Sequence, residues 1–253
     1  MGTRLLVLVA LVAAAGCQGQ SVTLLDDPEE ILAAAVTTTT AATSVHVDLT
    51  AEGTLAVDLF GSGAQGDINL VGTTLAADLD IAGRETRATF SSPNLFGLAG
   101  DVVLADDTLF LKSTLTGPKF RPSALGAPPE NPLKGLADLM SRADLAPVKG
   151  PDVPCAGGTC YTLSMRLTAD DLTALGGGGV QLPTGLPIPL PDVSGAAVDL
   201  TLHVEQVTTR LSGITAAVDL GDTGDLRLEA TFTRWNEPVE IAPPPADQIE
   251  GTG

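Results

Sequence analysis

The feature that most limits what this chain can fold into is a repeated alternation of apolar and polar residues, in short runs separated by turn-forming residues. A period of two places successive side chains on opposite faces of a strand, so each run predicts a strand with one buried and one wet face. The predicted strands are 45–49, 55–59, 68–71, 75–81, 102–104, 109–111, 161–167, 198–204, 214–220 and 226–232. The links between neighbouring strands are mostly short, which favours an antiparallel meander.

Helical spacing interrupts the strands at three points, which are 27–43, 133–145 and 169–175. The first helix can be capped by Asp26 or Asp27 and carries Pro28 at a first-turn position. The apolar faces comprise Ile31, Leu32, Ala35 and Val36 in the first helix, and Leu133, Leu136, Leu139, Met140 and Ala143 in the second. Strands dominate, so the predicted class is α+β: one strongly curved antiparallel sheet whose concave apolar face is covered by helices.

The first seventeen residues, MGTRLLVLVALVAAAGC, have the layout of a secretion signal. Arg4 precedes an apolar run that is shorter than the roughly 20 residues a membrane-spanning helix needs. Small residues lead directly into Cys17, as they do in a lipobox, whose cysteine thiol is acylated before cleavage. We therefore expect a lipoprotein signal peptide at 1–16 and lipidation of Cys17; the alternative is an ordinary signal peptide with an incidental cysteine. Two or more fatty chains give stable membrane anchoring, so we expect an extracytoplasmic, membrane-tethered protein.

The charge and the aromatic content further limit the possible functions and the composition of the interior. Asp and Glu number 31 against 13 Lys and Arg, and loss of Arg4 moves the formal charge from −18 to −19. Such a surface repels nucleic acid. Hydrophobic residues make up 44% but aromatics only 3%, so the interior must be built from aliphatic and small residues. That composition fits a roomy cavity and equally fits the codon bias of a GC-rich genome.

Two cysteines remain once Cys17 is acylated. Cys155 and Cys160 are separated by four residues, two of them glycine, and a secreted chain lies in an oxidising compartment. We predict a local disulfide between them, with a small loop-closure contribution to stability. A metal site is a poorer alternative because no histidine is near, and a redox pair is more often spaced by two residues.

A Gly/Pro-rich segment from Gly176 to Gly195 has two interpretations. It lacks the Lys-Ser/Thr of a phosphate-binding loop, and it is unusually apolar for a surface connector. It is either a lid over an apolar pocket or a connector docked on the domain. The lid candidates are Val180, Leu182, Leu186, Ile188 and Leu190.

No sequence motif indicates catalysis. His46 and His203 each lie between apolar neighbours in an alternating strand, so we expect their side chains on the polar, solvent-exposed face. No GxSxG elbow, HExxH pair or Cys-His arrangement is present. The paired acids at 106–107 and 170–171 occupy a turn and a helix start, where carboxylates have structural roles. We expect neither an enzyme nor a metal or cofactor site.

The order of these features resembles the actinobacterial lipoproteins LppX, LprA, LprF and LprG. A lipobox, a helix, a meander, a second helical stretch and a Gly/Pro-rich loop precede a closing hairpin that ends in RWNEPV (234–239). That stretch is the sharpest part of the resemblance, and SVHVDL (44–49) supports it. The resemblance spans roughly Pro28 to Ile241. The low aromatic content and the Cys155/Cys160 pair depart from the family pattern.

The resemblance implies a half-barrel of antiparallel strands with helices on its concave side, enclosing an apolar cavity. It implies that acylated lipids, including glycolipids and phospholipids, are taken up there and moved across the cell envelope, with an envelope lipid transporter as a partner. The residues expected to line the cavity are Leu136, Met140, Leu200, Leu202, Leu226, Leu228 and Phe232, and for each the alternative is ordinary core packing.

These inferences divide the chain into a signal peptide (1–16), a lipidated tether (17–27), one lipid-binding domain (28–242) and a polar tail (243–253). Two other functions stay open. One is a structural surface lipoprotein with a filled core, and the other is an assembly factor that binds a protein partner through its sheet.

Overall fold

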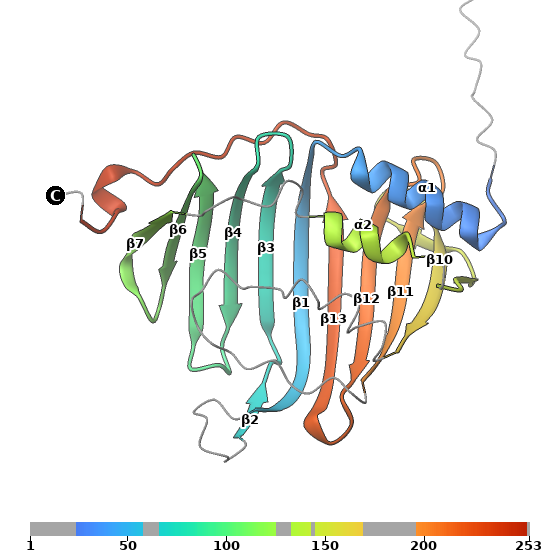
Figure 1. The fold of residues 1–253 in the computed structure, drawn as a ribbon, viewed down its shortest axis with the longest axis horizontal. Coiled ribbons are helices and arrows are strands. Elements are labelled where there is room, and N and C mark those ends of the chain that lie inside the picture. Colours follow the sequence, from blue (N-terminus) through green and yellow to red (C-terminus); the bar gives the residue numbers. More distant parts are fainter. Residues whose placement is uncertain (1–23, 58–65, 125–132, 143–144, 169–195, 252–253) are drawn as a thin grey trace, which may run out of the picture.

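Thirteen strands form one antiparallel sheet in the computed structural model, which describes residues 24–57, 66–124, 133–142, 145–168 and 196–251 (Figure 1). The strands are β1 (Ser44–Val57), β2 (Gly66–Asn69), β3 (Thr73–Asp80), β4 (Glu85–Ser92), β5 (Leu98–Ala105), β6 (Thr108–Ser113), β7 (Gly117–Ala124), β8 (Val148–Lys149), β9 (Val153–Cys155), β10 (Gly158–Leu167), β11 (Ala197–Glu205), β12 (Leu211–Asp219) and β13 (Gly224–Thr233). The α-helices are α1 (Pro28–Thr40) and α2 (Lys134–Met140), and short 3-10 turns occupy Gly221–Thr223 and Ala246–Gln248.

The sheet consists of two meanders joined by β1. The strand order is β7-β6-β5-β4-β3-β1-β13-β12-β11-β10-β8, while β2 pairs with β1 and β9 pairs with β10. The meander in the first half of the chain was predicted from the short links between its strands. The junction is long-range, because β1 pairs with β3 along one edge and with β13, near the end of the chain, along the other. The sheet is not closed into a barrel in the described residues, since β7 and β8 end the order.

Helix α1 begins and ends close to the predicted positions. The Asp27 carboxylate caps it by accepting a hydrogen bond from the Glu29 amide at 2.9 Å, and Pro28 opens the first turn. The threonines near its end are helical as predicted, and the hydroxyls of Thr37 and Thr40 donate to carbonyls four residues back.

Five strands differ from the sequence prediction, and of these the short β8 and β9 were not predicted at all. Strand β1 continues through 44–57 where two strands were expected. Gly53 permits this: its φ is +128°, and a Cβ there would lie 2.2 Å from the Asp225 carbonyl oxygen of the paired strand. Strand β4 was not predicted because its sequence, ETRATFSS, is mostly polar on both faces. Strand β7 was not predicted because it contains two prolines, which its edge position tolerates.

One face of the sheet carries the apolar residues of the alternating strands. The register aligns them in rows, one of which runs Leu163, Leu202, Ile214, Ala230, Leu49, Leu75 and Phe90 across seven strands. Helices α1 and α2 pack on this face over β10–β13 (Figure 1). Their residues Ile31, Leu32 and Met140 belong to the same buried cluster as Leu202 and Phe232, which we call the main core.

A second, smaller core lies on the opposite face. Val103 of β5 and Phe110 of β6 are register partners that point away from the helices. The segment after β13 crosses this face, and its Ile241 packs against them together with Phe120 of β7. Further along, Ile249 bridges to Phe120, and Arg121 pairs with Glu250 at 2.6 Å.

No helix in the described part of the chain is long and apolar enough to cross a membrane.

Candidate functional site

The apolar face of the sheet extends well beyond the part that the helices cover. Several apolar side chains there are half-buried and lie outside the main core; we call eight of them the open apolar face. Its members are Leu49, Leu75, Phe90, Val102, Leu104, Leu111, Leu226 and Leu228. The strand register places all of them on the face that carries α1 and α2. A partly exposed apolar surface of this extent marks a binding surface more often than a plain exterior.

Two hollows lie over β1 and β3–β6, and by the strand register most of the side chains that line them point to the face opposite the open apolar face. The first, about 240 Å³, is lined by Leu49, Leu75 and Phe90 with their strand neighbours. The second, about 730 Å³, follows over β4–β6, and its lining also includes Phe90 and the polar side chains of Asp101 and Lys112. Gly100 makes room for the Phe90 ring, because a Cβ there would lie 2.8 Å from the Phe90 Cζ atom. Phe90 is among the lining residues of both hollows.

A third hollow, of about 560 Å³, lies between the two helices. Its apolar lining is Leu32 and Val36 of α1 with Met140, Leu145 and Pro147, and Glu29 and Arg142 are among its polar lining residues. Its volume falls in the range of about 300–1,000 Å³ that is usual for small-molecule sites. Of the three hollows, this one is bounded by the main core, so an apolar chain bound here would contact residues that are already packed.

The structure divides the seven predicted cavity residues into two groups. Met140, Leu200, Leu202 and Phe232 are buried in the main core, with exposed fractions of 0–5%, and Leu136 packs partly buried against it. Leu226 and Leu228 instead belong to the open apolar face. All the strand residues point to the predicted side, but the buried ones contact other side chains as ordinary core. The five lid candidates and Cys17 lie outside the described residues.

Sequence reasoning missed the part of the open apolar face that comes from the first half of the chain. Leu49, Leu75 and Leu111 lie in strands that the alternation predicted, and their side of the strand could be read from the same period. Their proximity to Leu228 could not be predicted from the sequence, because it follows from the pairing of β1 with β13.

Comparisons with known proteins identify the fold. No family model matches the chain, and no curated protein matches it. Among solved structures, LprF from Mycobacterium bovis is similar over 88% of this chain and 99% of its own, with a TM-score of 0.55 and 17% sequence identity. The chain has the fold of LprF. The lipoprotein LppX from Mycobacterium tuberculosis is 18% identical over 86% of this chain and 100% of its own, with a TM-score of 0.49. The family resemblance predicted from the sequence is thus confirmed at the level of the fold.

Within the LprF fold, the two sequence stretches that carried the resemblance contact each other. Arg234 Nη2 lies 2.6 Å from Asp78 Oδ1, which also lies 2.7 Å from His46 Nδ1. Asp48 Oδ2 lies 3.2 Å from the other ring nitrogen of His46. His46 points to the polar face as predicted, but its side chain is only 18% exposed because these partners surround it. The RWNEPV and SVHVDL stretches are two sides of one contact between the last and first strands.

Trp235 and Asn236 complete this contact. Trp235 is buried, stacks on Phe232 with ring centroids 5.8 Å apart, and donates its indole N–H to the Leu211 carbonyl at 3.0 Å. The Asn236 Oδ1 accepts a hydrogen bond from the Thr43 backbone amide at 2.8 Å, and the Asn236 backbone amide donates to the Ser44 carbonyl at 2.9 Å. These contacts give both residues a structural role in joining the end of the last strand to the start of the first.

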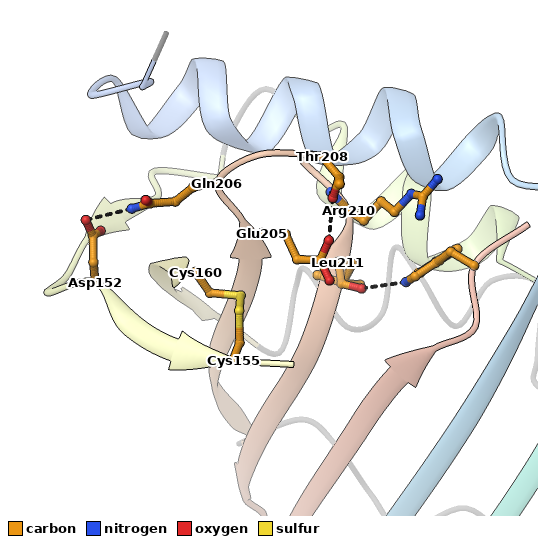
Figure 2. The surroundings of a disulfide bond; sticks show 9 residues. Asp152, Cys155, Cys160, Glu205, Gln206, Thr208, Arg210 and Leu211 are labelled. Carbon is orange, nitrogen blue, oxygen red and sulfur yellow. Dashed lines mark hydrogen bonds between the residues drawn. A yellow bond between two sulfur atoms is a disulfide. The ribbon is translucent and has the colours of Figure 1, made fainter. Parts of the chain in front are cut away.

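The predicted disulfide is present and joins β9 to β10 (Figure 2). The Cα atoms of Cys155 and Cys160 are 5.8 Å apart, and the bridge closes a hairpin whose register pairs Cys155 with Gly158. Beside it, Gln206 donates to Asp152 at 2.7 Å. The disulfide thus fixes a hairpin at one corner of the LprF fold, away from the open apolar face.

The residues before α1 are fastened to the sheet near that corner. The Leu25 amide donates to the Tyr161 hydroxyl at 2.7 Å, and Lys149 Nζ lies 3.0 Å from the Asp26 carboxylate and 5.1 Å from the centre of the Tyr161 ring. The hydrogen bond from Lys149 to Asp26 raises the pKa of that lysine above its usual range. The tether therefore meets the domain at a defined point next to β8 and β10.

Proposed function

We propose that this chain is an extracytoplasmic lipoprotein, anchored to the membrane by acylated Cys17, that binds acylated lipids and carries them across the cell envelope without catalysis. The observation that carries the proposal is the open apolar face. Eight half-buried apolar side chains continue the main core across the sheet, on the face that carries α1 and α2.

The physical basis is the removal of acyl chains from water. Each buried methylene contributes about 0.8 kcal/mol, so a surface of Leu, Val and Phe holds a fatty chain without specific polar contacts. Selectivity among lipids then comes from the length of the apolar face and from the polar groups at its ends.

The fold supports the same function. The chain shares the LprF fold over 88% of its length, and the lipoprotein family that the sequence resembles takes up glycolipids and phospholipids between a half-barrel and its helices. We assign α1 and α2 the role of those helices, with the hollow between them as one end of a lipid site that begins at the open apolar face.

A protein-binding or structural lipoprotein is the second candidate. Four of the seven cavity residues predicted from the sequence are fully packed in the main core, which is what a filled core requires. In that case the open apolar face would be covered by a protein partner.

Lipid extraction tests the proposal directly. Residues 18–253 contain every described residue; the purified chain is extracted with organic solvent, and bound lipid is measured by mass spectrometry. Near-stoichiometric diacyl or triacyl lipid is expected. A lipid-free protein that also fails to take up a fluorescent phospholipid would contradict the carrier function and favour the second candidate.

A pair of neighbouring variants locates the site. Leu75→Lys places a charge on the open apolar face, whereas Thr74→Lys places the same charge one residue away on the exposed opposite face. We expect Leu75→Lys to lose most of the bound lipid and Thr74→Lys to keep it, with folding of both checked by thermal unfolding. Equal lipid content in the two variants would place the lipid elsewhere.

A further inference from the structure

Three exposed apolar side chains gather at one end of the β3–β7 half of the sheet. They are Val71, Phe96 and Leu115, with exposed fractions of 50%, 80% and 63%, and we call them the apolar rim. Val71 lies in the bend between β2 and β3, Phe96 in the turn between β4 and β5, and Leu115 in the turn between β6 and β7. All three connections lie at the lower end of the sheet in Figure 1.

Hydrogen bonds join the three connections to one another. Asn94 Nδ2 donates to the Val71 carbonyl at 2.8 Å, and Thr114 Oγ1 donates to the Gly97 carbonyl at 3.3 Å. The turns also satisfy backbone amides internally, for instance Leu95 to Ser92 at 3.1 Å. The transfer of a turn from water into an apolar medium costs much less free energy when its backbone groups are already hydrogen-bonded. The rim is therefore a connected set of protrusions that can enter an apolar medium.

The charge distribution separates the rim from the rest of the surface. In a chain with 31 acidic residues, the connections 70–72, 93–97 and 114–116 contain no charged residue. The connections at the other end of the same strands, 81–84 and 106–107, contain Arg84 and the pair Asp106-Asp107. Insertion into a lipid surface requires apolar side chains without charged neighbours. The rim offers one aromatic and two aliphatic side chains of this kind.

The backbone at Phe96 adds an independent observation. Its φ is +54°, a left-handed conformation that bulky residues rarely adopt. An asparagine or aspartate adopts that conformation with less strain, and its polar side chain would be well solvated at this exposed position. Instead, the position holds the most exposed large apolar side chain of the described residues. Strain of this kind collects at functional positions.

We propose that the apolar rim docks on the surface of a lipid bilayer, as a membrane contact separate from the Cys17 anchor. Leu98, two residues after Phe96, is half-buried on the apolar face of the sheet, so the rim runs directly into the open apolar face. Docking would thus place one end of that face at the bilayer surface. The contact does not depend on lipid carriage, and the two proposals can fail separately.

Vesicle flotation tests the docking. Residues 18–253, which lack the acylated cysteine, are mixed with phosphatidylcholine vesicles and separated on a density gradient. We expect the chain to float with the vesicles and the double variant Phe96→Asn, Leu115→Asn to float at least ten-fold less. Asparagine suits the left-handed backbone at position 96, so the substitution is not expected to harm folding.

Val207→Asn is the matched control, because Val207 is 65% exposed in the turn between β11 and β12 at the opposite end of the sheet. We expect it to float like the parent chain. The proposal is overturned if the parent does not float, if the double variant floats equally, or if Val207→Asn loses as much. A dimer in sedimentation that the double variant abolishes, without flotation of the parent, would assign the rim to self-association instead. Bound lipid, measured on the same samples, reports separately on lipid carriage.

Discussion

At the residue scale, the positions most recognisable in the sequence proved to be those that join the ends of the chain. Arg234, Trp235 and Asn236 follow the last strand, and each contacts a different part of the fold: the polar face at Asp78, the main core at Phe232, and the segment before β1 at Thr43. The alternation alone could place His46 on the polar face. It could not predict the partners of His46, because Asp78 and Arg234 are 32 and 188 residues away.

Asn236 should be the most sensitive of these positions to a small change. Its backbone is left-handed, with a φ of +58°, and its side chain binds the Thr43 amide at 2.8 Å. We expect Asn236→Ala to lower the free energy of unfolding by about 1–3 kcal/mol, since it loses a hydrogen bond and adds backbone strain. Urea unfolding measures this loss.

Two companion variants separate the causes of that loss. Asn236→Gly keeps the backbone freedom and removes only the side-chain bond, so it should cost less than Asn236→Ala. Glu237→Ala changes an exposed side chain and leaves its carbonyl, which accepts from Ser44, in place; its effect should stay within about 0.5 kcal/mol. Equal losses for Asn236→Gly and Asn236→Ala would show that strain makes no contribution.

At the element scale, the sequence predicted helix α1 and most strands well and failed where tertiary contacts decide. The cap and periodicity of α1 are local, and so are the alternations of β11 and β13. Strand β4 is polar and becomes a strand because β3 and β5 pair with it on both sides. The two-residue β8 and the single span of β1 depend likewise on their neighbours, which no local pattern contains.

The disulfide is an element-scale feature with a limited expected effect. Cys155 and Cys160 are five positions apart, and the loop-entropy relation gives about 2 kcal/mol for so short a closed loop. We expect Cys155→Ser with Cys160→Ser to lower the free energy of unfolding by about that amount and to leave bound lipid unchanged. Urea unfolding with and without a reductant checks the first point, because the reductant should affect the parent chain and not the variant. A loss of bound lipid would connect the hairpin to the site.

At the scale of the whole molecule, one sheet has a core on each face, at opposite ends of its strand order. The main core lies under α1 and α2 over β10–β13, and the smaller core lies on the other face over β5–β7 (Figure 1). The open apolar face extends from β13 through β1 and β3 to β6, so it continues the main core on one side and backs onto the smaller core at its far end. The sequence predicted one apolar face; the second core needed β7 and the segment after β13, neither of which alternates clearly.

This arrangement predicts that the two ends of the sheet differ in local stability. Ile241 is 7% exposed and packs on Val103, Phe110 and Phe120, so Ile241→Ala removes buried methyl groups from the smaller core at a cost of about 2–4 kcal/mol. Local unfolding occurs first in the least stable part of a structure. Amide hydrogen exchange should therefore speed up in β5–β7 and stay unchanged in β10–β13. Glu240→Ala, an exposed neighbour, should leave both ends as they are. A uniform increase over all strands would show instead that the sheet opens as one unit.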